Sequence, residues 1–196
     1  MTELEKMLAG EPYDCGDDEL LELWHLAKKL TQEYNSLNSK DLSKKKELLK
    51  YILGEVGENL WVTPPFYVDY GYNIFLGNNC EINMNCVLLD CNKIIIGDNA
   101  LIAPFVQIYT AYHPTHYLDR FENQNTDNFQ FCLTKTAPVT IGNNVWIGGG
   151  AIILPGVNIG DNVVIGAGSV VTKDIPSDTI AFGNPCVSIK ENLQDI

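Results

Sequence analysis

Residues 143–171 read NNVWIGGGAIILPGVNIGDNVVIGAGSVV. An aliphatic residue, often followed by glycine, returns at every sixth position of this stretch. An α-helix repeats its faces about every 3.6 residues and a β-strand every two, so neither explains a period of six. A fixed short period is typical of solenoids, and six residues is the repeat of parallel β-helices. The sequence therefore predicts coils in which each six-residue unit forms a short strand and a corner.

The same period extends over much of the chain. It comprises Leu76, Ile82, Leu88, Ile94, Ile96, Ile102, Ile108, Ile141, Ile147, Ile153, Ile159, Ile165 and Val171, with a slip of two positions at Ile96 and a gap before Ile141. We expect these side chains to point inward and to stack at the strand spacing of about 4.8 Å. A sandwich of antiparallel strands is excluded because it needs alternation at every second residue. Glycine after the aliphatic residue is expected to serve a tight corner through its access to positive φ.

Two segments that precede the repeats have helical spacing. Residues 17–34 place an apolar residue on one face at nearly every turn, with Asp17 or Asp18 as the N-cap. Residues 41–53 have a similar period, and glycines and the pair Pro64–Pro65 follow it. Because a solenoid has open ends, we expect these helices to cover one end or one side. The predicted organisation is a helical segment at 1–57, a β-helix at 58–189 with an inserted loop at 111–140, and a tail at 190–196.

Composition and charge exclude several classes of protein. The chain has 196 residues, of which 45% are hydrophobic and 19% charged, which is typical of one globular domain. Its net charge is −12, and the basic run SKKKELLK is too short for a nucleic-acid surface. Neither a membrane-spanning run nor an apolar signal core is evident. We expect a cytoplasmic protein that binds neither nucleic acid nor membrane.

The cysteines and histidines do not predict a metal site. No two of the six cysteines form a CxxC pair, and the three histidines lie at positions 25, 113 and 116. Zinc sites need closely spaced ligands of these types. The sequence therefore predicts reduced thiols and no metal.

The interruption of the repeats at 111–140 is the best candidate for a functional loop, because long loops in regular folds are commonly functional. It begins within TAYHPTHYLDR, residues 110–120. His113 precedes a proline, which keeps the backbone before it extended. A histidine, with its ordinary pKa of about 6.5, is the natural general base at neutral pH. His113 is therefore the candidate catalytic residue.

Several motifs together resemble one family. DYGYNIFLGNN (69–79), IGDNALIAP (96–104), TAYHP (110–114), IGNNVWIGG (141–149) and VIGAGSVVTKDIP (164–176) with GNPC (183–186) are similar to the maltose and galactoside O-acetyltransferases, which are hexapeptide-repeat acyltransferases. The opening KMLAGEPYD (6–14) is similar as well. The resemblance implies a left-handed coil and a homotrimer with active sites between subunits. It also implies acetyl-CoA as donor, a sugar hydroxyl as acceptor and no metal.

The resemblance also assigns roles to individual residues. His113 takes the place of the catalytic base. The acceptor positions are Asp14, Asp69, Asn83 and Cys91, the last in preference to Asp90. The positions on the CoA side are Trp146, Gly149, Ala167, Thr172, Lys173 and Lys190. The implied mechanism is direct transfer, with His113 as base and the backbone N–H of Gly149 stabilising the oxyanion.

Two features depart from the family pattern. Val187 stands where relatives carry an arginine for the cofactor's phosphates, and Lys190 cannot reproduce a bidentate arginine grip. We therefore expect this chain to bind CoA more weakly than its relatives do. The stretch NQNTDNFQFCLTK (123–135) replaces the usual glutamate–tyrosine sequence, so the sequence does not indicate which group orients His113.

Two alternatives stay open. The acceptor could be a nodulation-factor sugar, an amino sugar or an antibiotic, and the β-helix could be a non-catalytic binding module. A γ-class carbonic anhydrase is disfavoured because that site needs three histidines on zinc, and the repeats with their loop contain two.

Overall fold

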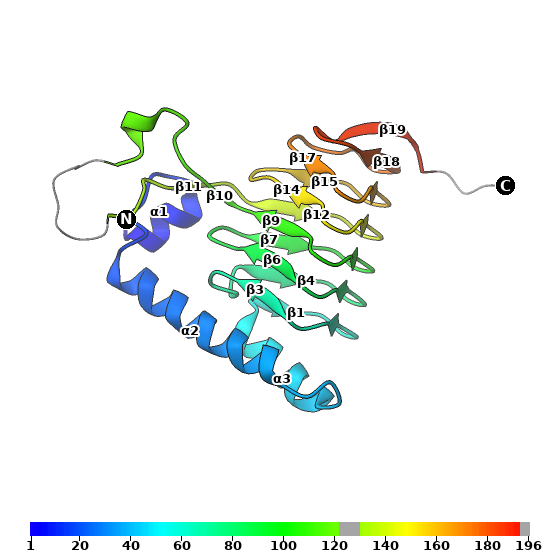
Figure 1. The fold of residues 1–196 in the computed structure, drawn as a ribbon, viewed down its shortest axis with the longest axis horizontal. Helices are drawn as coiled ribbons and strands as arrows, with labels where there is room; N and C mark the ends of the chain where they lie inside the picture. Colours follow the sequence, from blue (N-terminus) through cyan, green and yellow to red (C-terminus); the bar gives the residue numbers. More distant parts are fainter. Residues whose placement is uncertain (122–129, 193–196) are drawn as a thin grey trace.

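Three sheets form the walls of a β-solenoid of about six turns in the computed structural model, which describes residues 1–121 and 130–192 (Figure 1). Their strands pair in parallel, except for the last strand of sheet 2, which pairs antiparallel with the strand before it. Sheet 1 holds β1 (Glu55–Val56), β4 (Ile74–Leu76), β7 (Ile94–Ile96), β12 (Val139–Ile141) and β15 (Asn158–Ile159). Sheet 2 holds β2 (Trp61–Val62), β5 (Glu81–Ile82), β8 (Leu101–Ile102), β13 (Trp146–Ile147), β16 (Val164–Ile165), β18 (Thr179–Phe182) and β19 (Val187–Glu191). Sheet 3 holds β3 (Phe66–Val68), β6 (Cys86–Leu89), β9 (Gln107–Tyr109), β14 (Ile152–Ile153) and β17 (Val170–Val171).

The aliphatic positions of the six-residue period fill the core, as predicted. None of the side chains from Leu76 to Val171 in that series is more than 3% exposed. They stack in register, so that Ile147 pairs with Ile102 below it and with Ile165 above it. The slip at Ile96 arises because β7 turns both of its end residues inward. Burial of each such side chain contributes about 1.5–3 kcal/mol, which makes this column the main stabilising feature of the solenoid.

The period begins one coil earlier than the sequence analysis placed it. Val56, Val62 and Val68 lie on β1, β2 and β3 at the same spacing of six, and Val62 and Val68 are buried. β1 pairs in parallel with β4, and β2 with β5. The two prolines at 64–65 occupy the corner between β2 and β3, so they interrupt neither strand.

Asparagine side chains form a ladder along the corner between sheets 1 and 2. Asn79 donates to Asn99 (2.8 Å), Asn99 to Asn144 (2.9 Å), Asn144 to Asn162 (2.9 Å) and Asn162 to Asp178 (2.8 Å). All five residues have φ between 56° and 58°. Asparagine and aspartate tolerate this left-handed conformation better than other side chains that carry a Cβ. The ladder thus turns each corner and links one coil to the next.

The glycines that precede this ladder have a different purpose from the one expected. Their φ angles are not positive, because the asparagines make the left-handed turn. A Cβ on Gly142 would lie 2.5 Å from Oδ1 of Asp161, and one on Gly97 would lie 2.6 Å from Oδ1 of Asn143. These glycines are required because successive coils approach too closely for any side chain.

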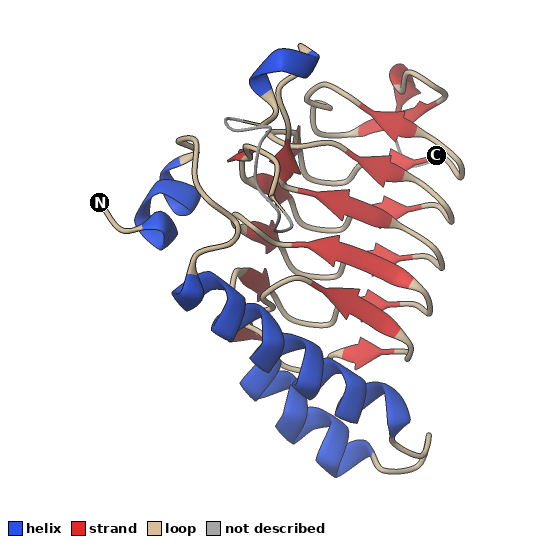
Figure 2. Cartoon of the chain, turned by 60° about the vertical axis from the view of Figure 1, so that its left-hand side comes forward, coloured by secondary structure: helices blue, strands red, loops and turns tan. Residues whose placement is uncertain are grey.

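Helices cover the N-terminal end of the solenoid, as predicted. α2 (Asp18–Ser36) begins at Asp17, whose side chain accepts from the backbone N–H groups of Glu19 and Leu20, and α3 (Leu42–Ile52) follows it. Figure 2 shows these two helices side by side across the end of the stacked strands. The Tyr34 hydroxyl donates to the carbonyl of Val62 at 2.7 Å, which fixes α2 on the first coil. Among the described residues, no helix has the length and apolar character needed to cross a membrane.

A third helix, α1 (Glu3–Ala9), was not predicted. Thr2 and Glu5 form a reciprocal capping box at its start, a signal that the sequence contains as TELE. Gly10 ends the helix at φ 77°, and a Cβ there would lie 2.8 Å from the carbonyl oxygen of Thr136. The helix is therefore docked against the base of the inserted loop.

Candidate functional site

His113 lies at the base of the loop that leaves the solenoid after β9. Two short antiparallel strands, β10 (Ala111–Tyr112) and β11 (Lys135–Thr136), close this loop at its neck (Figure 1). A single turn of 3₁₀-helix, η1 (Tyr117–Asp119), follows His113. Residues 122–129 of the loop, part of the stretch that departs from the family pattern, lie outside the described residues. The neck holds His113 at a defined place beside the coil.

The imidazole of His113 is oriented by the two residues that precede β11 on the returning side of the loop. Its Nδ1 atom lies 3.1 Å from the carbonyl oxygen of Leu133 and 3.3 Å from the hydroxyl of Thr134. A carbonyl oxygen can only accept, so this contact places the proton on Nδ1. Nε2 of the exposed ring then carries a free lone pair. The geometry suits a side chain that accepts a proton from a bound hydroxyl group.

Arg120, the one arginine of the sequence, braces the segment that follows His113. Its Nε donates to the carbonyl of Pro114 and its Nη2 to the carbonyl of Thr115, both at 3.0 Å. The backbone carbonyl of Arg120 accepts from the N–H of Leu133 at 2.7 Å. Arg120 thereby ties both sides of the loop to the residue that orients His113. The sequence analysis missed this role, because contacts from an arginine to distant carbonyls leave no sequence signature.

The N-terminal segment also contacts Thr134, one of the two residues that orient His113. Tyr13 forms an antiparallel bridge with Thr134, and the Cys15 thiol donates to the Thr134 hydroxyl at 3.0 Å. Asp14, predicted on the acceptor side, lies between these two residues and is exposed. Its Oδ1 accepts from the N–H of Gly16 at 2.8 Å. The structure therefore brings Asp14 into the neighbourhood of the His113 loop.

Asp69 and Cys91, two further predicted acceptor positions, lie together on the same edge. They follow β3 and β6 at the ends of those strands, and the Cys91 thiol lies 3.6 Å from Oδ2 of Asp69. Burial raises the pKa of Cys91, so the thiol keeps its proton at neutral pH and acts as the donor. The pair forms one wall below the His113 loop.

Two residues of α2 complete this wall and were not predicted to do so. Lys28 Nζ lies 3.2 Å from Oδ1 of Asp69, and Trp24 Nε1 lies 3.4 Å from the same oxygen. The Lys28 ammonium also sits 4.7 Å above the centre of the Trp24 ring. Trp24 and Lys28 are four residues apart, so the sequence shows that they share a face of α2. Their contact with Asp69 depends on how α2 packs against the solenoid, which the sequence does not show.

Asp90 supports the wall from beneath. It is fully buried, and its carboxylate accepts from the backbone N–H groups of Asp69 (3.0 Å), Tyr70 (2.9 Å) and Asn73 (3.2 Å). Burial raises its pKa to about 7, and backbone N–H donors such as that of Tyr70 act in the opposite direction. Because no surface of Asp90 is exposed, this residue positions Asp69 and does not contact a ligand.

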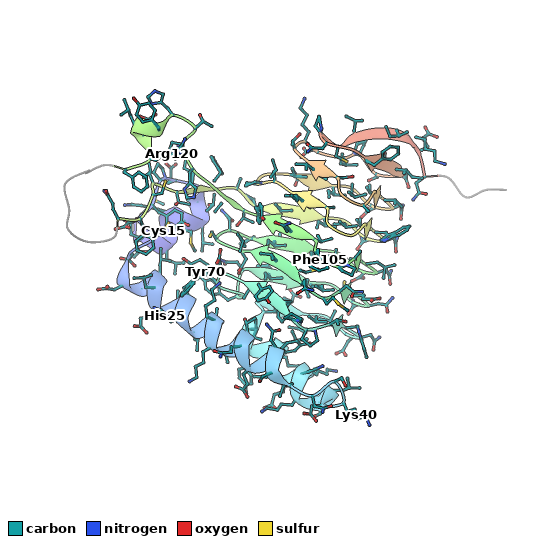
Figure 3. The ribbon with its side chains drawn as sticks, in the orientation of Figure 1. Cys15, His25, Lys40, Tyr70, Phe105 and Arg120 are labelled. Carbon is teal, nitrogen blue, oxygen red and sulfur yellow. The ribbon has the colours of Figure 1, made fainter. Side chains whose placement is uncertain are left out.

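The remaining acceptor position, Asn83, lies on a different edge of the solenoid. It follows β5, at the corner between sheets 2 and 3, and its Nδ2 donates to Oε1 of Glu81 at 3.1 Å. Asn83 therefore precedes β6, whereas Cys91 follows it, so the width of sheet 3 separates them. Figure 3 shows Cys15, Tyr70 and Arg120 along one side and Phe105, from the same corner column as Asn83, away from them. One protomer alone does not unite the predicted acceptor residues.

Most of the residues predicted on the CoA side gather near that second edge. Gly149 and Ala167 lie in corners stacked on that of Asn83, and the Gly168 N–H donates to the Gly149 carbonyl at 2.9 Å. Trp146 lies on sheet 2 and is 54% exposed. Lys190 on β19 continues the same column, because the pairing runs from Trp146 through Val164 and Ile180 to Lys190.

Thr172 and Lys173 do not join this group. They follow β17 at the opposite end of sheet 3, on the edge from which the His113 loop leaves. The structure thus divides the predicted CoA-side residues between two edges, as it divides the acceptor residues. Within the described residues, no cluster of three or more His, Cys, Asp or Glu side chains could hold a metal ion.

Comparisons with known proteins agree with this architecture. Residues 6–57 match the maltose acetyltransferase hexapeptide capping motif, and residues 138–173 match the bacterial transferase hexapeptide repeats. A maltose O-acetyltransferase from Clostridium difficile 630 superposes with a TM-score of 0.91 at 47% identity, and the match covers 99% of both chains. The chain belongs to the maltose and galactoside O-acetyltransferase family.

Further proteins match this chain over a similar extent. A galactoside acetyltransferase in complex with coenzyme A has a TM-score of 0.90 at 42% identity, covering 98% of this chain and 92% of its own. Nodulation protein L of Rhizobium meliloti is 47% identical over 184 residues, or 94% of this chain and 96% of that protein. The resemblance to maltose and galactoside O-acetyltransferases found in the sequence is confirmed, and each of these matches covers 94% or more of this chain.

Proposed function

We propose that this family member transfers an acetyl group from acetyl-CoA directly to a hydroxyl of a sugar such as maltose, glucose or a galactoside, with His113 as general base. One observation carries the proposal: Nδ1 of His113 is bound to the Leu133 carbonyl, which leaves Nε2 free to accept a proton. The likeness to a maltose O-acetyltransferase and to a galactoside acetyltransferase bound to coenzyme A supports the choice of donor and acceptor class.

In the proposed reaction, Nε2 of His113 removes the proton from the sugar hydroxyl as the oxygen attacks the thioester carbonyl carbon. The carbonyl oxygen gains negative charge in the tetrahedral intermediate, and the backbone N–H of Gly149 stabilises it. The C–S bond then breaks, and the departing CoA thiolate takes the proton back from Nε2. The products are the sugar acetate and CoA, and the enzyme returns to its starting state.

The proposed active site lies between subunits of a homotrimer. His113 and Asp69 lie at one end of the sheet 3 strands, and Asn83 and Gly149 lie at the other. A site built from both groups therefore needs two protomers placed edge to edge. The outer face of sheet 2 supports such an assembly, because Trp61, Leu101 and Trp146 are each about half exposed there, in a column interrupted by Glu81. Exposed apolar patches of this kind commonly mark subunit interfaces.

Lysines near the two edges of sheet 3 are proposed to bind the anionic CoA. The chain carries a net charge of −12, so cations near the thioester site must act locally. Lys173 and Lys190 are both exposed, and each lies close to one of the proposed site edges. Val187, in the place of the family arginine, lies on β19 opposite Phe182 and supplies no charge.

An acetyl-CoA assay across a panel of acceptors tests the function. Free thiol release is followed with maltose, glucose, a galactoside, a nodulation-factor oligosaccharide and an amino sugar. The nodulation-factor sugar belongs in the panel because of the 47% identity with nodulation protein L. We expect release with at least one of the first three acceptors. Release with none of those three would overturn the proposed acceptor class, and release with no acceptor would overturn acetyl transfer.

A further inference from the structure

A cavity lies at the N-terminal end of the solenoid, away from the His113 loop. It measures about 470 Å³ and opens between α2, α3 and the first coil. Small-molecule sites typically have roughly 300–1,000 Å³. Apolar side chains make up most of its wall: Leu37, Leu42, Leu49, Val56, Leu60 and Val62. In Figure 3, Lys40, which lies next to this cavity, and Arg120 mark opposite ends of the molecule.

Two lysines, Lys45 and Lys46, interrupt the apolar wall, and Lys45 is the buried one. Lys45 is only 9% exposed, and it shares the buried face of α3 with Leu48, Leu49 and Ile52. Its stem is buried among these residues, whereas its ammonium keeps contact with solvent, as is usual for a lysine on an apolar surface. In residues 1–121 and 130–192, the Lys45 ammonium has neither an ion pair nor a hydrogen bond, and the residue lines the cavity.

The two neighbouring lysines show the contrast. Lys44 Nζ lies 3.0 Å from a Glu33 carboxylate oxygen, and Lys46 Nζ lies 3.5 Å from one of Glu58. Both of these lysines are more than half exposed. The two exposed neighbours of Lys45 therefore each have a carboxylate partner, whereas Lys45 has none among the described residues.

We infer that this cavity binds a small carboxylate with an apolar tail, of the medium-chain fatty acid type. The carboxylate pairs with the Lys45 ammonium, and the tail occupies the space lined by the leucines and valines. A single negative charge matches the single unpaired cation, since Glu58 already neutralises Lys46 at the rim. A polyphosphate does not suit this site, because Lys45 is the one lining cation without a carboxylate partner among the described residues. The inference is independent of the proposed acetyl transfer.

Binding of decanoate tests the inference, with decanol as a ligand of the same chain length that lacks the charge. Isothermal titration of the full-length protein is done below the micelle-forming concentration. We expect decanoate to bind the wild type at least about tenfold more tightly than decanol, because a charged hydrogen bond forms in an apolar setting. Equal affinities, or no binding of decanoate, would overturn the inference.

Variants of Lys45 and of its neighbour Lys44 test which lysine binds the carboxylate. Lys45→Met replaces the charge with an unbranched apolar side chain in an apolar stripe, so we expect it to fold, as circular dichroism can verify. Lys45→Met should bind decanoate at least about tenfold more weakly than the wild type and should bind decanol with unchanged affinity. Lys45→Arg and the matched control Lys44→Met should bind both ligands with wild-type affinity. Unchanged decanoate affinity in Lys45→Met, or an equal loss in Lys44→Met, would show that Lys45 does not bind the carboxylate. Acetyl transfer should stay at the wild-type rate in Lys45→Met.

Discussion

Nδ1 of His113 lies 3.1 Å from the carbonyl oxygen of Leu133, a residue twenty positions further along the chain. This contact fixes both the tautomer and the direction of the imidazole, so the catalytic proposal depends on how the two sides of the loop are held together. Arg120 and the N-terminal segment hold them from two directions.

Arg120 is expected to act as a positioning residue for His113. Arg120→Gln removes the charged donors to Pro114 and Thr115 and should lower kcat about tenfold, because small displacements of a catalytic group are costly. The KM for acetyl-CoA should stay unchanged. Steady-state kinetics check this, with Asp119→Asn, an exposed neighbour, as the matched control. Identical kcat values for the two variants would contradict the assignment.

Asp90 is expected to make the stability of the protein depend on pH. Its pKa is about 7 in the folded state, compared with an ordinary value of about 3.9 when unfolded. Between these values the folded state holds a proton that the unfolded state has lost. The free energy of unfolding should therefore fall as pH rises from about 4 to 7, by up to about 1.4 kcal/mol per pH unit. Urea unfolding at several pH values measures this slope.

The Asp90→Asn variant identifies the group responsible for this slope. Asparagine cannot titrate, so the part of the slope that comes from Asp90 should disappear, while Asp119→Asn should keep it. The variant should also lose some stability at every pH, because one of the N–H donors to the carboxylate loses its acceptor. Parallel pH curves for the wild type and Asp90→Asn would show that Asp90 does not titrate in this range.

Mixing two inactive variants tests whether the site spans two subunits. His113→Ala and Asn83→Ala are each expected to have little activity as pure trimers. Co-refolded at equal amounts, they should recover about a quarter of wild-type activity, because random assembly pairs an intact His113 edge with an intact Asn83 edge at about one site in four. No recovery in trimers confirmed to be mixed would place the whole site within one protomer.

Val187→Arg is expected to strengthen the hold on CoA. Val187 is exposed on β19, so a longer side chain can be accommodated without disturbing the core. Arginine binds phosphate through two parallel hydrogen bonds, and we expect the KM for acetyl-CoA to fall about three- to tenfold. Val187→Lys is the matched control and should give a smaller decrease. An unchanged KM in Val187→Arg would mean that CoA does not reach β19.

The fold could be predicted from the sequence because one period specifies the core. The inward position of each isoleucine, such as Ile147, is determined by its own six-residue unit and by the units stacked above and below it. The first coil was missed because Pro64 and Pro65 occupy one of its corners and obscure the repeat. α1 was missed although its capping box is present in the sequence.

The candidate site was less predictable because its contacts join distant segments. His113 could be identified from its motif, but its partner Leu133 and the brace Arg120 depend on how the loop returns. Trp24 and Lys28 were interpreted only as part of a helix, and the docking of α2 gave them Asp69 as a partner. No local pattern encodes such pairings.

The most direct test of the account is the rate of acetyl transfer by His113→Ala, measured as thiol release from acetyl-CoA with an accepted sugar. Because a general base contributes about 10²–10⁴-fold, we expect kcat to fall by that factor while the oligomeric state and circular dichroism stay those of the wild type. A correctly assembled His113→Ala variant that transferred acetyl groups at the wild-type rate would contradict the proposed mechanism.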